Sequence, residues 1–150
     1  MRRILVLFAL IVLLSFGVSF AQQSSKPPGA EPVPEPIPAE AIAKVNPVKP
    51  TPEGLEQAKK LYGYHCSMCH GKNGDGKGDL AEQMKLNLHD WRDASSIAKM
   101  TDGELFYIIT NGRGKMTGGE GDRTKDEVRW QLVNYVRSFG TKAADSTTSK

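Results

Sequence analysis

The chain has 150 residues, a formal charge of +3 and nearly balanced ionisable side chains, with 20 Lys and Arg against 17 Asp and Glu. This balance excludes the strongly basic field through which proteins bind nucleic acids. The length leaves room for one ordinary domain with a small core, once the unusual ends of the chain are set aside.

Residues 1–21 have the organisation of a secretory signal peptide. Two arginines precede an apolar run from Ile4 to Phe20, and the small residues Ser19 and Ala21 stand at the positions that a signal peptidase reads. An uncleaved membrane anchor is the alternative, because the run is almost long enough to span a bilayer. In both cases we predict export to the periplasm or another extracytoplasmic compartment, with membrane tethering through the N-terminus as one outcome.

All nine prolines of the chain lie between Pro27 and Pro52. They recur with Glu, Ala and Val and show no amphipathic period, which is typical of extended polyproline II segments. We therefore expect residues 22–50 to form a Pro-rich flexible linker. It could act as a tether or spacer, or be a leader without a task of its own.

Two helices are expected on either side of a glycine-rich region. Thr51 can cap the first, and Pro52 suits its first turn. The second begins with the capping box Thr101–Glu104, and the pair Asn111 and Gly112 is expected to close it.

A third helix is expected near the C-terminus of the chain. The capping box Thr124–Glu127 opens it, and Gly140 is expected to end it. Because no internal repeat and no convincing strand pair is present, we assign residues 51–140 to one all-α domain. Residues 141–150 are polar and are expected to form a disordered tail.

The two cysteines of the chain, Cys66 and Cys69, are followed at once by His70. A thioredoxin-like redox pair is disfavoured, because no βαβ pattern surrounds the motif. A zinc site is disfavoured too, since ligands confined to one helical turn cannot surround an ion tetrahedrally. A disulfide would close a loop too short to stabilise the fold much.

Covalent haem attachment remains, because C-x-x-C-H is its sequence signature. Two thiols three positions apart lie on one side of a helical turn, from which Cys66 and Cys69 can form thioethers with two vinyl groups of one porphyrin. His70 is then turned towards the iron as the proximal ligand. We predict one covalently bound haem c.

Residues 53–140 resemble the class I monohaem c-type cytochromes of the small bacterial kind. The resemblance rests on the order of "LYGYHCSMCHGKNGDGKGDLA", "MTDGELFYIITNGRGKM" and "DEVRWQLVNYVRSF". It implies a cytochrome c-like helical globule around one covalently bound haem, in which the first and last helices cross. It also places Gly63 and Tyr64 of the first helix, and Tyr135 of the last, at that crossing.

The same resemblance makes Met116 the distal iron ligand, opposite His70. Met116 is flanked by glycines and has no apolar face to join, whereas Met84 and Met100 stand beside apolar residues and are expected in the core. His89 is the alternative ligand, and bis-histidine ligation would lower the reduction potential.

The sequence departs from this family at two positions. Asp79 stands where the family usually has a proline whose carbonyl accepts the proximal ring N–H, so the orientation of His70 is less constrained. Thr117 stands where a proline commonly follows the distal methionine, so the loop around Met116 is expected to be looser.

Three further side chains could donate hydrogen bonds to the haem propionates. Ordinary packing of the aromatic residue and solvent exposure of the two arginines are the alternatives. They are Trp91, Arg92 and Arg113.

We therefore predict an exported one-electron carrier rather than an enzyme, acting in a respiratory or other periplasmic electron-transfer chain. Its partners would be other redox proteins, met through transient contacts or within a membrane oxidoreductase, and not nucleic acids. If Met116 does not bind the iron, the alternative is a five-coordinate haem enzyme or gas sensor with peroxidase-like chemistry.

Overall fold

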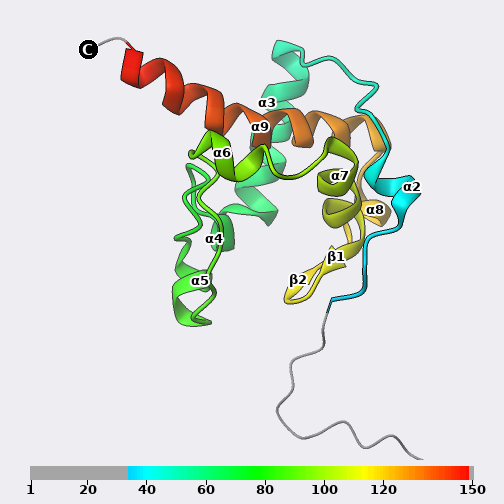
Figure 1. The fold of residues 1–150 in the computed structure, drawn as a ribbon, viewed down its shortest axis with the longest axis horizontal. Coiled ribbons are helices and arrows are strands. Elements are labelled where there is room, and N and C mark those ends of the chain that lie inside the picture. Colours follow the sequence, from blue (N-terminus) through cyan, green and yellow to red (C-terminus); the bar gives the residue numbers. More distant parts are fainter. Residues whose placement is uncertain (1–33, 149–150) are drawn as a thin grey trace, which may run out of the picture. The chain divides into compact units, whose positions relative to one another are not determined.

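Two long helices, α3 (Pro52–His65) and α9 (Asp126–Thr148), cross in the computed structural model, which describes the backbone of residues 34–148 and the side chains of residues 34–141 (Figure 1). Helix α3 begins as predicted. The Thr51 hydroxyl accepts a hydrogen bond of 3.0 Å from the Gly54 amide, and Pro52 occupies the first turn. The predicted signal peptide lies outside the described residues.

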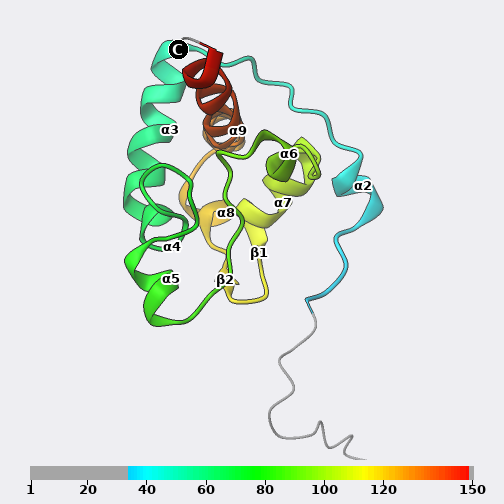
Figure 2. The ribbon, with the colours of Figure 1, turned by 60° about the vertical axis from the view of Figure 1, so that its left-hand side comes forward.

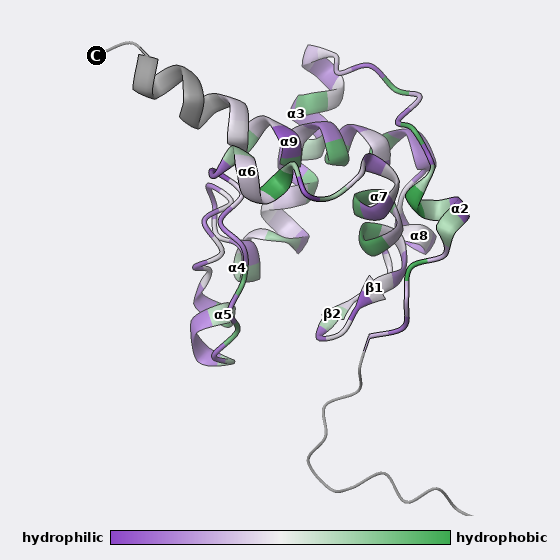
Figure 3. Ribbon diagram, in the orientation of Figure 1, coloured by the Kyte–Doolittle hydropathy of each residue, from purple (hydrophilic) through white to green (hydrophobic). Residues whose placement is uncertain are grey.

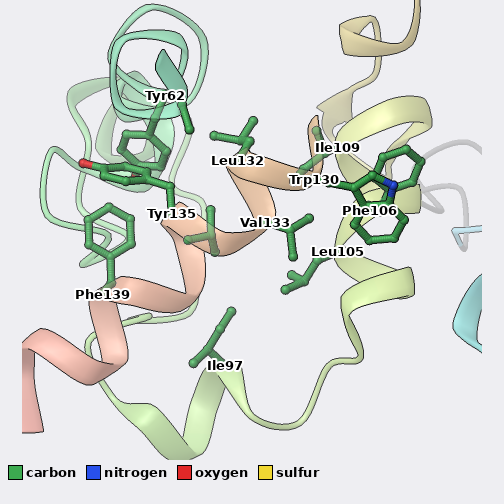
Figure 4. Close-up of a cluster of buried hydrophobic side chains, with 12 residues drawn as sticks. Tyr62, Ile97, Leu105, Phe106, Ile109, Trp130, Leu132, Val133, Tyr135 and Phe139 are labelled. Atoms are coloured by element: carbon green, nitrogen blue, oxygen red, sulfur yellow. The ribbon is translucent and has the colours of Figure 1, made fainter. Parts of the chain in front are cut away.

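Aromatic rings fill the space between α3 and α9. The Tyr62 ring lies edge-on to Tyr135, with the ring centroids 5.4 Å apart, and 5.2 Å from the centroid of Phe139 (Figure 4). Ala58 is fully buried one turn before Tyr62. Tyr135 therefore lies at the crossing, as the family resemblance implies.

The other two residues predicted at this crossing lie elsewhere. A Cβ atom added to Gly63 would meet no atom of the described part of the chain within 4 Å, and Tyr64 is 80% exposed. The close approach occurs at Gly54, where an added Cβ would lie 2.5 Å from the Gln131 side chain. The glycine at the close approach is therefore Gly54 and not Gly63, more than two helical turns earlier than predicted. The reason is that the buried face of α3 runs through Gly54, Ala58 and Tyr62.

Helix α7 (Asp102–Asn111) begins with the predicted capping box. The Thr101 hydroxyl accepts from the Glu104 amide at 3.1 Å, and the Glu104 carboxylate accepts from the Thr101 amide at 2.7 Å. The helix packs against α9, where Phe106 stacks on Trp130 with ring centroids 4.0 Å apart (Figure 4).

Short elements connect these three helices. The helical ones are α4 (Ser67–His70), α5 (Asp79–Gln83), α6 (Ala94–Ile97) and α8 (Glu120–Arg123). A two-residue antiparallel hairpin, β1 (Gly112–Arg113) and β2 (Met116–Thr117), was not expected, and it pairs Arg113 with Met116. The fold is mostly helical, as predicted, and Figure 3 shows that the segments around α5 are largely hydrophilic.

Helix α9 differs from the prediction at both ends. The Thr124 hydroxyl donates to the Glu120 carbonyl at 2.9 Å instead of capping α9. At the other end the helix passes through Gly140 and continues to Thr148, into the predicted tail. An added Cβ at Gly140 would lie 3.2 Å from the Cα atom of Ala94, so this glycine allows α6 to pack closely and does not end the helix.

Residues 34–50, here called the N-terminal strap, pack against the helices. Its short helix α2 (Ala39–Ile42) contacts α7 (Figure 2). The Thr101 hydroxyl donates to the Ile42 carbonyl at 2.8 Å, and a Cβ on Gly103 would overlap the Ala41 carbonyl oxygen.

Polar side chains of α9 hold the second half of the strap. Asn134 and Gln131 donate to the carbonyls of Val48 and Lys49, each at 2.9 Å, and Asn46 donates to the Asn134 side chain at 2.9 Å. The first two bonds satisfy backbone carbonyls that no helix or sheet would pair. For residues 34–50 the flexible-linker prediction is therefore corrected; residues 22–33 lie outside the described residues.

The structure was also searched for membrane spans. Among the residues that it describes, no helix has the length and apolar character needed to cross a bilayer.

Candidate haem site

The C-x-x-C-H motif forms a single helical turn. Cys66 ends α3 and begins α4, and its carbonyl accepts from the amides of Cys69 and His70 at 3.1 and 2.9 Å. Both thiols are free and partly buried. The local hydrogen bonding therefore places the two sulfur-bearing residues and the histidine on one turn, which we call the proximal turn (residues 66–70).

A buried tyrosine fixes the exit from the proximal turn. The Tyr62 hydroxyl donates to the Gly71 carbonyl at 2.7 Å, and Gly71 adopts a φ of 76°, which favours glycine. Burial raises the pKa of Tyr62 well above its ordinary value, so the phenol remains a neutral donor. The turn is thus tied to the core of the α3–α9 crossing.

Met116 lies on the hairpin that follows α7. Gly112 and Gly114 have φ angles of 79° and 60°, and a Cβ on Gly112 would overlap the backbone of Gly118. Glycine is therefore required at position 112, where the chain reverses towards Met116. We call residues 112–118 the distal loop.

Two cavities of about 470 and 540 Å³ lie between the proximal turn and the distal loop. Cys66, His70, Ile109 and Met116 line both cavities, and Cys69 lines the first. Because the two cavities share these lining residues, we treat them together as one hollow. All four predicted site residues line it, although 46 positions separate His70 from Met116 in the sequence.

The lining of this hollow fits a haem. Apolar side chains dominate its walls away from the motif; they include Leu80, Leu86, Leu105, Leu132 and Val136. Burial lowers the pKa of His70 to about 4 and raises the pKa of the Cys66 thiol to about 12. The imidazole is therefore neutral at physiological pH and has a lone pair available for a metal.

Other residues considered from the sequence take different places. His89 is exposed, although it lines the second cavity with Arg113. Met100 packs against the core as predicted, but the core prediction for Met84 is wrong, because its side chain is 46% exposed at the first cavity. Arg92 is exposed and forms an ion pair of 2.7 Å with Asp90.

Sequence reasoning missed a buried carboxylate beside the motif. Glu120 is 8% exposed, and its Oε1 atom lies 2.7 Å from Nδ1 of His65 and 3.4 Å from Arg123. Glu120, His65 and Arg123 all line the first cavity. No sequence pattern signals this cluster, because 55 positions separate His65 from Glu120.

Trp91 was considered as a propionate ligand or as ordinary packing, and the structure gives it a more specific place. Its ring stacks on the His70 ring, with the centroids 4.2 Å apart and the planes inclined by 17°. The Nδ1 atom of His70 is buried and has no hydrogen-bond partner among the residues that the structure describes. This agrees with the expectation that, with Asp79 in place of the proline, the orientation of His70 is less constrained by a hydrogen bond from the ring.

A covalent haem protein is the class that this helical fold and its C-x-x-C-H turn define. The protein family described as Cytochrome c matches residues 55–140. The chain belongs to the cytochrome c family, and its domain serves haem-based electron transfer, with Cys66 and Cys69 as the C-x-x-C motif for haem c. The predicted family, fold class and cofactor are confirmed.

Solved structures include similar chains. One is "KustC0563 c-type cytochrome", with 33% identity, covering 55% of this chain and 95% of that chain at a TM-score of 0.48. Another is titled "Kuenenia stuttgartiensis reducing HAO-like protein complex Kustc0457/Kustc0458", with 25% identity and a TM-score of 0.53. The match covers 70% of this chain and 51% of the length of that chain. No curated protein matches the chain.

Proposed function

We propose that the protein is an exported one-electron carrier in which His70 and Met116 are the two axial ligands of the haem iron. The observation that carries the proposal is that both side chains line the same two cavities as Cys66. When bound, the haem supplies an iron that alternates between the ferric and ferrous states. The chain supplies a neutral imidazole, a thioether and largely apolar walls.

An electron carrier is favoured over an enzyme, because two ligands from the chain leave no iron position for a substrate. A peroxidase-like enzyme would also need a polar distal group in the cavity. His89, the histidine considered for this role from the sequence, lines the second cavity but is exposed. A five-coordinate haem enzyme or gas sensor remains the second candidate, and the experiment below distinguishes it.

Other redox proteins are the proposed partners, met transiently or as fellow subunits. The support is that a similar chain belongs to a complex titled as a reducing HAO-like protein complex. The proposed compartment is the periplasm or another extracytoplasmic space, because the N-terminal sequence reads as an export signal that could also act as a tether.

The optical spectrum of the haem-loaded protein tests the ligand set. We expect a weak near-infrared absorbance from iron–sulfur charge transfer in the ferric protein and no carbon monoxide binding by the ferrous protein. Met116→Ala should abolish the band and allow carbon monoxide to bind. Met84→Ala is the matched control, because Met84 lines the first cavity from an exposed position.

Two results would contradict the proposal. A high-spin ferric spectrum with ready carbon monoxide binding in the unaltered protein would favour the five-coordinate enzyme or sensor. A low-spin spectrum that survives Met116→Ala but is lost in His89→Ala would favour bis-histidine ligation.

A further inference from the structure

The proximal histidine lacks the hydrogen bond that ordinarily orients a metal-binding imidazole. Such a ring usually donates its second N–H to a carboxylate, a carbonyl or water, which fixes its plane. Within residues 34–148, no group forms a hydrogen bond with the buried Nδ1 atom of His70. Something else must therefore restrain rotation of the ring.

Trp91 is in the position to do so. Its ring faces the His70 ring almost in parallel, with the centroids 4.2 Å apart, and both residues line the second cavity. A flat contact of this kind opposes rotation about the Cβ–Cγ bond of the histidine, because turning the imidazole would drive its edge into the indole face. The edge of the imidazole remains free to meet a metal.

The glycine-rich loop after the motif holds Trp91 in place. The Trp91 amide donates to the Gly74 carbonyl at 2.8 Å. A Cβ on Gly74 would lie 2.7 Å from the Phe139 ring, and one on Gly76 would lie 2.9 Å from the Leu88 carbonyl. These close contacts leave room for no side chain, so the loop lies flat between α9 and the segment that carries Trp91.

We propose that Trp91 is the positioning residue of the proximal histidine: its indole face, in place of a hydrogen bond to Nδ1, sets the plane of the His70 ring. The inference rests on the proposed role of His70 as iron ligand. An imidazole without an acceptor at Nδ1 is a weaker electron donor than a hydrogen-bonded one, which favours the ferrous state.

Substitution in the full-length, haem-loaded protein tests the inference. In the ferric state, the order and spread of the four haem methyl proton resonances report the orientation of the axial imidazole plane. We expect Trp91→Leu to change that order, because leucine presents no flat face to the imidazole, while Trp91→Phe, which keeps a flat ring, retains the order.

The chain offers a matched control in Trp130. Trp130 stacks on Phe106 with a centroid distance of 4.0 Å and an inclination of 19°, but it lines neither cavity. Trp130→Leu should lower thermal stability and leave the order of the methyl resonances unchanged. An unchanged order in Trp91→Leu, or the same change in Trp130→Leu, would overturn the inference.

A measurement on the unaltered protein removes any dependence on how the variants fold. In the diamagnetic ferrous state we expect a nuclear Overhauser effect between the ring protons of Trp91 and His70. We also expect the Nδ1 proton to lack the downfield shift of a hydrogen-bonded proton. Haem-shifted His70 protons without the Overhauser effect would overturn this inference alone, whereas His70 protons without a haem ring-current shift would overturn the proposed ligand role.

Discussion

The two sides of the haem site are built in different ways. The proximal turn is made from five consecutive residues, and hydrogen bonds to the Cys66 carbonyl close it. The distal loop depends on glycines with positive φ and on the position of α7, whose last residue precedes it. A local motif therefore suffices for one side of the site, while the other side requires the rest of the fold.

The N-terminal strap is one of the distant segments on which the distal side of the site depends. It contacts α7 at Thr101 and Gly103, near the start of the helix that leads to the distal loop. At the loop itself, Pro34 is the nearest neighbour of a Cβ placed on Gly114, at 3.5 Å. Changes in the strap should therefore affect the distal side of the site more than the proximal side.

The largest effect is expected from removing both thiols of the proximal turn. Cys66→Ala with Cys69→Ala should abolish covalent haem retention completely, since no thioether can form. Haem staining after denaturing electrophoresis measures this. Ser67→Ala, which alters the same turn but keeps both thiols, is the control, and haem that persists in the double variant would refute the assignment of the motif.

Gly112→Ala should be the most damaging single change in the distal loop. Its φ of 79° and the overlap with Gly118 should together cost about 3 kcal/mol or more of the free energy of unfolding. Gly114→Ala has a similar φ, but its added Cβ would make only an ordinary van der Waals contact with Pro34 at 3.5 Å, and we expect a loss of about 1–2 kcal/mol.

Urea unfolding measures the stability of both glycine variants, and the near-infrared absorbance measures the ligand. The band should weaken more in Gly112→Ala than in Gly114→Ala. Equal losses in the two variants would mean that the backbone overlap at Gly112 does not shape the loop.

The strap can be tested with two helical glycines that should respond with opposite signs. Alanine is intrinsically better in a helix, so Gly63→Ala, with nothing near its added Cβ, should stabilise the protein by about 0.5–1 kcal/mol. Gly103→Ala should instead destabilise it by about 1–3 kcal/mol, because the new methyl group overlaps the Ala41 carbonyl. If thermal unfolding shows both variants stabilised, the strap does not pack on α7 in solution.

A smaller loss of stability is expected when the hydrogen bond that ties the proximal turn to the core is removed. Tyr62→Phe removes the 2.7 Å hydrogen bond to the Gly71 carbonyl and should cost about 1–2 kcal/mol. Tyr64→Phe, on the same helix but 80% exposed, should change stability by less than about 0.5 kcal/mol. The near-infrared band should be unchanged in both variants, since neither touches the distal loop.

The raised pKa of Tyr62 leads to a prediction of how the free energy of unfolding changes at alkaline pH. Burial raises its pKa in the folded protein, so above its ordinary pKa of about 10 the unfolded chain loses the proton first. Stability should therefore fall as the pH rises beyond about 10, and the fall should be smaller in Tyr62→Phe. Denaturant titrations at several alkaline pH values compare the two proteins; parallel curves would contradict the buried neutral phenol.

Much of the local structure could be predicted from the sequence. The starts of α3 and α7 were predicted correctly, because Thr51 and Thr101 bond to amides only three residues away. The end of α9 was not, because Gly140 is explained by its contact with Ala94 rather than by helix termination. A glycine looks the same in the sequence whether it ends a helix or admits a neighbour.

The candidate site divides in the same way. The proximal residues and Met116 followed from a motif and a family resemblance, whereas the stacking of Trp91 on His70 could not be read from the sequence. Contacts such as that of Asn46 with Asn134 join residues 88 positions apart. They depend on how the helices pack, and composition alone made the strap look like a linker.

By itself the sequence determined the chemistry of this protein. The C-x-x-C-H turn and the helix caps act over a few residues, and the cytochrome c family pattern can be recognised along residues 55–140. The tertiary structure decided which side chains surround that chemistry. It placed Met116 across a hollow from His70, set Trp91 against the imidazole, and bound the strap to α7 and α9. Such arrangements depend on close packing between distant segments, and no local pattern encodes them.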